Sequence, residues 1–246
     1  MKITMQLLLA ALLMLSFAVV SPAAARPAPV FCDTVLSDMV IASDLVVPER
    51  SHCELNNVTV LGDVRLRNGA GFTPYDSRIA GSITGARFEL LQLLNTTVEG
   101  NIRLRGGVRV ELTGATVAGD LRLNNLFEVV LLESQVWGAL VVRDINGQVQ
   151  FCGTTVEHDA RFAGNSGWIM VGGDLATCAA NAVHGTLRVH HNQQAITIAN
   201  NTVGQNLICA ANDPAPTVFA NQVRGKTRGQ CGGNEPVDAR ELAETE

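Results

Sequence analysis

The chain has 246 residues and a formal net charge of −5; 47% of its residues are hydrophobic, 17% are charged and 4% are aromatic. This mildly acidic composition argues against nucleic acid or an anionic membrane surface as a general partner. The length suits one domain, and no apolar stretch after residue 25 is long enough for a stable membrane span.

Residues 1–25 have the features of a secretory signal peptide. Lys2 supplies the positive end, residues 7–20 form an apolar segment too short for a stable anchor, and three alanines at 23–25 supply a cleavage site. We therefore expect the protein to be exported, to the periplasm or to the extracellular medium.

A repeat of 19 or 20 residues occupies most of the remaining chain. Clear copies are TVLGDVRL at 59–66, TVEGNIRL at 97–104 and TVAGDLRL at 116–123. A fixed short period of this kind is typical of a solenoid. One apolar landmark marks each copy, and it recurs at Val60, Ile79, Val98, Val117, Val136, Val156, Val183, Val203 and Val223.

Each repeat contains alternating apolar residues, as expected for a strand with one buried face. A second apolar strand follows a glycine-rich corner, with Val108, Val110 and Leu112 in one copy and Phe127, Val129 and Leu131 in the next. Such a unit buries its apolar face only by stacking on equivalent units, about 4.8 Å apart.

We therefore predict an all-β fold, a single-stranded parallel β-helix of about ten 19–20-residue coils over residues 26–233. A β-sandwich is the alternative, but a sandwich does not require a 19-residue register. Residues 234–246 leave the repeat and form an acidic C-terminal tail.

The six cysteines fall into pairs about one coil apart. Neighbouring coils bring equivalent Cα atoms within disulfide range, and export provides an oxidising compartment. Zinc is the competing interpretation, but no Cys-x-x-Cys spacing occurs, so we predict no metal and no other cofactor. The predicted disulfides are Cys32–Cys53, Cys152–Cys178 and Cys209–Cys231.

The column two residues before the landmark ends in Asn181, Asn201 and Asn221, which we expect to stack as an internal amide ladder. The step from Val156 to Val183 is longer than the others and carries about seven extra residues. Insertions in repeat proteins form loops that often carry function, whereas the competing interpretation is a bulge with solvated histidines. Nearby residues suited to a site are His158, Asp159, Trp168, Asp174 and His184.

Two outward columns of the repeat are rich in arginine. They contain Arg65, Arg103, Arg122, Arg161 and Arg188 in one column, and Arg67, Arg105, Arg143 and His190 in the other. Such a face would bind an acidic polysaccharide or another anionic component of the cell envelope. The competing interpretation is self-neutralisation, in which Asp63, Asp120 and Asp159 pair with arginines of their own or adjacent coils.

The motifs VEGNI at 98–102, VAGDL at 117–121 and VGQNLIC at 203–209 resemble the coils of uncharacterised secreted bacterial β-solenoid proteins. They more loosely resemble the bactofilins, whose cores also stack short Val/Gly-rich coils. That resemblance implies a structural role and self-association through the solenoid ends. Bactofilins lack an export signal and disulfides, whereas this chain carries a cysteine pair near each end.

These observations favour an exported non-enzymatic solenoid with a structural, adhesive or anionic-polymer-binding role. The alternative is a polysaccharide lyase or hydrolase, because parallel β-helices often host such enzymes. Sugar-stacking aromatics are scarce, with Tyr75, Trp137 and Trp168 the only tyrosine and tryptophans. No column clusters aspartates at the separation that glycoside hydrolysis requires, so we predict no catalytic residue.

Overall fold

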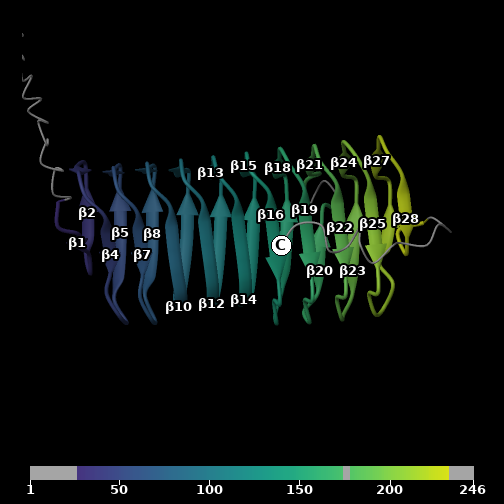
Figure 1. The fold of residues 1–246 in the computed structure, drawn as a ribbon, viewed down its shortest axis with the longest axis horizontal. Coiled ribbons are helices and arrows are strands. Elements are labelled where there is room, and N and C mark those ends of the chain that lie inside the picture. The colour runs from purple at the N-terminus through teal and green to yellow at the C-terminus, as the bar shows by residue number, and fades with distance from the viewer. Residues whose placement is uncertain (1–26, 174–177, 233–246) are drawn as a thin grey trace, which may run out of the picture.

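Each strand of the fold hydrogen-bonds in parallel to the equivalent strand of the next coil. The computed structural model describes residues 27–173 and 178–232, which contain 28 strands and no helix. The strands stack as rungs of a rod, coil after coil from the purple N-terminal end to the yellow C-terminal end (Figure 1). The predicted signal peptide and acidic tail lie outside the described residues.

Three parallel stacks of strands form the sides of each coil. The first sheet contains β1 (Val30–Phe31), β4 (Leu45–Val47), β7 (Val64–Leu66), the first halves of β10 (Ile83–Leu94), β12 (Ile102–Thr113) and β14 (Leu121–Leu132), then β16 (Leu140–Arg143), β19 (Ala160–Ala163), β22 (Leu187–His190), β25 (Leu207–Ala210) and β28 (Thr227–Gly229). The second sheet contains β2 (Val35–Ser37), β5 (His52–Asn56), β8 (Gly71–Tyr75), the second halves of β10, β12 and β14, then β17 (Val149–Cys152), β20 (Ile169–Val171), β23 (Ile196–Ala199) and β26 (Thr217–Phe219).

The third sheet consists of two-residue strands around the landmark position. It contains β3 (Val40–Ile41), β6 (Thr59–Val60), β9 (Arg78–Ile79), β11 (Thr97–Val98), β13 (Thr116–Val117), β15 (Gln135–Val136), β18 (Thr155–Val156), β21 (Ala182–Val183), β24 (Thr202–Val203) and β27 (Gln222–Val223). Because β10, β12 and β14 run through the corner between the first two sheets, those sheets form one 18-stranded hydrogen-bonded network beside the 10-stranded third sheet.

The register aligns apolar side chains in columns inside the coil. One such column of the first sheet runs from Leu45 through Ile102 to Leu207, and each of its members is at most 1% exposed. Removing this apolar surface from water is the main stabilisation of a chain whose coils are too short to form separate cores. The structure thus confirms the predicted parallel β-solenoid of about ten coils.

Each coil has three sides, one in each sheet, rather than the predicted two strands; in the coils of β10, β12 and β14 one long strand forms two of these sides. The landmark strand and the arginine-bearing strand are separate, because the chain turns at the glycine column represented by Gly100. A Cβ atom at Gly100 would lie 2.6 Å from the carbonyl oxygen of Gly81, so the stacked backbones approach too closely for another side chain.

The predicted alternation of the second strand is also wrong at its start. Val108 and Phe127 are 51% and 58% exposed. Strict alternation would turn them inward, because the residue two positions after each of them is buried. At the corner two consecutive side chains, Phe127 and Glu128, lie between buried Leu126 and buried Val129. A two-residue period fails where one strand bends from one sheet into the next.

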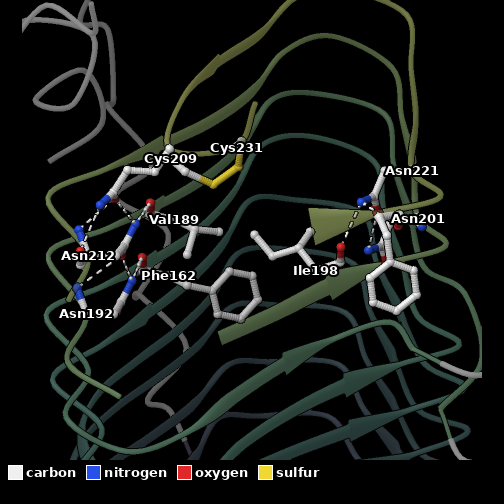
Figure 2. The surroundings of a disulfide bond; sticks show 11 residues. Phe162, Val189, Asn192, Ile198, Asn201, Cys209, Asn212, Asn221 and Cys231 are labelled. Carbon is white, nitrogen blue, oxygen red and sulfur yellow. Dashed lines mark hydrogen bonds between the residues drawn. A yellow bond between two sulfur atoms is a disulfide. The ribbon is translucent and has the colours of Figure 1, made fainter. Parts of the chain in front are cut away.

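The predicted amide ladder is present at the corner between the second and third sheets. Asn181 Nδ2 donates to Asn201 Oδ1 at 2.9 Å. Asn201 Nδ2 donates in turn to Asn221 Oδ1 at 2.9 Å (Figure 2). Earlier coils continue the ladder with hydroxyls; for example, the Ser134 hydroxyl accepts the Ala115 amide N–H. Each oxygen satisfies a backbone donor of the preceding coil, so this corner has few unmet hydrogen bonds.

A second amide ladder, which the sequence analysis missed, occupies the corner between the first and second sheets. Asn165 Nδ2 donates to Asn192 Oδ1 at 2.8 Å. Asn192 Nδ2 donates to Asn212 Oδ1 at 2.9 Å (Figure 2). Asn212 Nδ2 donates to Gln230 Oε1 at 3.1 Å, which completes the series. From the coil of β16 onward this corner is one residue longer than before, as the register of β14 with β16 and β17 shows. The amides bond the backbone of the longer corner.

The three disulfides join the pairs predicted from the spacing, with Cα–Cα distances of 5.0–5.4 Å. Cys32–Cys53 and Cys209–Cys231 connect the first two and the last two coils, where one side of each sheet lacks a neighbouring strand. Such end strands are the first to fray, so these bridges hold the least supported rungs.

Removing the C-terminal bridge should loosen only that end of the rod. We expect Cys209→Ala/Cys231→Ala to lower stability by about 2–4 kcal/mol and to accelerate amide exchange in β25 and β28. Exchange in the central β14 should stay unchanged, because each coil contacts only its neighbours. Hydrogen exchange measured by mass spectrometry tests this, and equal acceleration along the whole rod would contradict it.

Breaking the amide ladder should cost more than removing an adjacent exposed polar group. Asn201 is fully buried, accepts from the Asn181 amide and donates to the Val171 carbonyl. We expect Asn201→Leu to destabilise by at least about 3 kcal/mol, because several buried polar groups lose partners. Chemical denaturation provides the measurement, and the exposed neighbour substitution Thr202→Val, the control, should change stability by less than about 0.5 kcal/mol. Equal effects of the two substitutions would show that the ladder does not contribute the expected stability.

Candidate functional site

The predicted arginine columns lie in register on the outer face of the first sheet. Arg103 pairs in register with Thr84 and Arg122, and Arg161 pairs with Val141 and Arg188. From β7 to β22 the stripe covers seven rungs, whose six spacings amount to about 29 Å along the rod. The structure therefore places the eight predicted arginines on one face, although they differ in exposure and in pairing.

Carboxylates at the corner before the first sheet pair with three of these arginines. Arg65 Nη2 lies 2.9 Å from Asp44 Oδ2, and Arg188 Nη1 lies 2.6 Å from Asp159 Oδ2 of the preceding coil. Arg122 pairs within its own coil, with Asp120 at 3.2 Å. The alternative of self-neutralisation therefore holds for part of the stripe.

The same aspartates also bond the backbone through their second oxygen. Asp44 Oδ1 accepts the Asp63 N–H at 3.0 Å, Asp120 Oδ1 accepts the Ala139 N–H at 3.1 Å, and Asp159 Oδ1 accepts the Thr186 N–H at 2.7 Å. Each carboxylate thus ties one coil to the next while it holds an arginine.

Other arginines of the stripe have no such partner. Within residues 27–173 and 178–232, Arg67, Arg103, Arg105 and Arg143 form no ion pair, and the first three are exposed. Their guanidinium groups keep their full set of five N–H donors for a ligand.

Three exposed arginines line a shallow hollow, and two of them, Arg67 and Arg103, form no ion pair within the described residues. It has a volume of about 330 Å³ and is lined by Arg65, Arg67 and Arg103, with Thr84 and Ala86 on the rung between them. Arg105 is the register partner of Ala86, one rung beyond it. Small residues on β10 therefore separate two arginine-bearing rungs by about 9.6 Å. Arg65, Arg67, Arg103 and Arg105 form what we call the arginine cradle.

Farther along the face, the buried His190 lies among several cationic side chains. Burial, the guanidinium of Arg161 and then His191, Arg143 and Arg188 lower the pKa of His190 to about 4. Arg161 Nε donates to His190 Nε2 at 2.9 Å, so the imidazole proton lies on Nδ1, 2.8 Å from His191 Nδ1. Burial has the largest effect on this pKa, and the guanidinium groups that add to it give this part of the face a positive potential.

The residues predicted near the insertion do not form one site. The extra residues lie after β20, at 172–180, and the predicted Asp174 is outside the described residues. His184 Nδ1 lies 2.7 Å from Glu157 Oε2, and His158 is exposed near the same corner. Trp168 belongs to another corner, at the start of the second sheet, where it and Phe127 line one hollow. These residues are close in sequence, which suggested one cluster, but the path of the coil places them at different corners.

No group of three or more His, Cys, Asp or Glu side chains suited to a metal ion occurs in the described parts of the chain. The same parts contain no helix long and apolar enough to span a bilayer. Comparisons with protein-family models, with curated proteins and with solved structures find no match to this chain. The resemblance to bactofilin-type coils therefore stays a prediction, while the β-solenoid architecture is observed.

The low pKa of His190 predicts a stability that declines in acid. Between pH 6.5 and about 4 the unfolded imidazole binds a proton that the folded one does not, so stability falls as the pH is lowered through this window. We expect His190→Gln to show a smaller fall than the unmodified protein. Thermal unfolding at pH 7 and pH 4.5 gives the comparison, with exposed His52→Gln as the control. Identical pH dependence in the unmodified protein and His190→Gln would refute this assignment.

Proposed function

We propose that the protein is an exported, non-enzymatic solenoid that binds an acidic polysaccharide, or a similar anionic polymer of the cell envelope, along its first sheet. Three disulfides are typical of a chain that folds in an oxidising compartment, which supports export to the periplasm or the extracellular medium. The function itself is carried by the arginine cradle.

Planar guanidinium groups bind carboxylate and sulfate oxygens through two parallel N–H donors. The cradle presents four of them around the short side chains of Thr84 and Ala86, and Arg67, Arg103 and Arg105 have no carboxylate partner among the described residues. A repeating anionic polymer fits this geometry because charged groups recur along the rod, at Arg122, Arg143 and beyond. Once one charged group of the polymer is bound, its neighbours are at high effective concentration near the other arginines, so several weak contacts together give a higher affinity.

The carboxylates of the face support binding rather than cleavage. Asp120 and Asp159 each accept a backbone N–H through one oxygen and an arginine N–H through the other, so both carboxylates already hold the corner and the arginine. The predicted alternative, a polysaccharide lyase or hydrolase, would need a group that holds a cation or transfers a proton beside the bound sugar.

The test is a titration of the oxidised protein with polygalacturonate and with neutral dextran, at 20 mM and 300 mM salt. We expect binding only to the acidic polymer, weakened by salt because exposed charges are screened. Arg67→Gln/Arg105→Gln should weaken that binding at least about tenfold, since each lost charged hydrogen bond contributes about 1.5–3 kcal/mol.

Arg78→Gln/Arg224→Gln is the matched control, because it removes the same charge from exposed positions at the third sheet. It should bind almost as tightly as the unmodified protein. Equal weakening in both variants would show that only net charge matters and would reject the cradle. Appearance of unsaturated sugar ends in the mixture would favour the lyase alternative.

A further inference from the structure

A second hollow lies around the corner from the arginine face, at the start of the second sheet. It has a volume of about 510 Å³, within the range of small-molecule sites, and its lining includes Phe127, Glu128, Gln148, Trp168 and Gln194. Two large aromatic side chains are unusually open there, with Phe127 58% and Trp168 41% exposed. The arginine cradle lines a different hollow, so this inference does not rest on the proposed function.

Glycines create the space between the walls of this hollow. In register, the column of Phe127 continues as Gly147, Gly167 and Gln194 in the next three coils. A Cβ atom at Gly167 would lie 1.2 Å from the Gly147 carbonyl oxygen, and one at Gly147 would lie 3.2 Å from the Phe127 ring. Close backbone stacking in the longer corner therefore requires glycine on two rungs, and leaves about 14 Å between the Phe127 and Gln194 backbones.

Polar groups beside the hollow are held in place before any ligand arrives. Glu128 accepts Arg109 Nη1 at 3.0 Å through one oxygen and the Gln148 amide through the other, while Arg109 also bonds Glu111. The Ser166 hydroxyl lies 3.1 Å from Asn146 Oδ1. Two glutamates with one arginine give this patch a negative balance, which disfavours an acidic ligand.

One wall of the hollow has a strained backbone. Gln194 adopts a φ of 142°, a conformation that side-chain-bearing residues rarely adopt. Strain of this kind persists only where surrounding structure imposes it, and it is concentrated at binding sites. Here the Gln194 N–H bonds the Asp213 carbonyl oxygen at 3.1 Å, which keeps the residue at the rim.

We propose that this hollow binds a neutral pyranose residue of a polysaccharide. The apolar C–H faces of a pyranose stack on exposed aromatic rings, and its hydroxyls both donate to and accept from amides and carboxylates. Phe127 and Trp168 supply the rings, while Glu128, Gln148, Asn146 and Gln194 supply donors and acceptors on the rim. A purely apolar partner would leave the remaining donors and acceptors of these polar groups without a use.

Trp168 itself provides the signal for the test. In a Trp137→Phe background Trp168 is the only tryptophan, so its fluorescence reports the hollow directly. Titration with cellohexaose, a neutral oligosaccharide of pyranose rings, should give a saturable change in emission. Phe127→Ala and Gln148→Ala, in the same background, should each weaken binding at least about tenfold.

Two control variants make the result specific. Phe219→Ala removes another exposed aromatic ring of the second sheet outside the hollow, and Val108→Ala alters the position preceding Phe127 in the same column. Both should bind cellohexaose like the parent, as should Arg67→Gln/Arg105→Gln, which tests the arginine cradle separately. Circular dichroism and thermal unfolding confirm that each variant is folded.

No saturable change with cellohexaose, or an equal loss in Phe127→Ala and Phe219→Ala, would overturn the proposal. Binding of oligogalacturonate at the hollow in preference to cellohexaose would overturn the assignment of a neutral ligand. Binding of a hydrophobic dye alone, with no response to sugar, would identify the hollow as an apolar surface instead.

Discussion

Backbone hydrogen bonding between equivalent residues of neighbouring coils is the constraint on which the structure depends. A strand of two or three residues, such as β11 or β7, has no stability by itself. Its donors and acceptors are satisfied only when the coils before and after it keep the same register. That register then places every side chain, because inward columns become the core and outward columns become continuous surfaces.

At the corners of the coil, backbone groups need side chains as hydrogen-bond partners. Strand pairing satisfies the sides of the coil, but a turning backbone leaves N–H groups without strand partners. Hydroxyls, amides and carboxylates at two corners, and a second amide series at the third, accept these donors from a neighbouring coil. Asp44, Asp120 and Asp159 belong to this set, and their pairing with arginines is secondary to holding the corner.

The surface chemistry of the protein follows from the same columns. Because the corner carboxylates neutralise only some of the arginines, Arg67, Arg103 and Arg105 form a positive face on a chain with net negative charge. The added residue in the corner from β16 onward has a separate effect. It brings in the Asn165 ladder inside the coil and the glycine step outside it, so one change in coil length both requires a new internal hydrogen-bond series and opens the aromatic hollow.

The amino-acid sequence by itself determined the architecture, because a repeat of 19 or 20 residues leaves only one register in which the apolar landmark residues stack. The same period determined the three cysteine pairs, the Asn181 ladder and the common face of the arginines. Only the tertiary structure decided where the coil turns. The third side of the coil exposed Phe127 and Val108 and placed Trp168 away from His158 and His184. The register of the first sheet set Thr84 between Arg65 and Arg103. Periodicity shows which residues share a column, but the direction of a side chain at a corner depends on the path of the backbone and on the neighbouring coils that hold it.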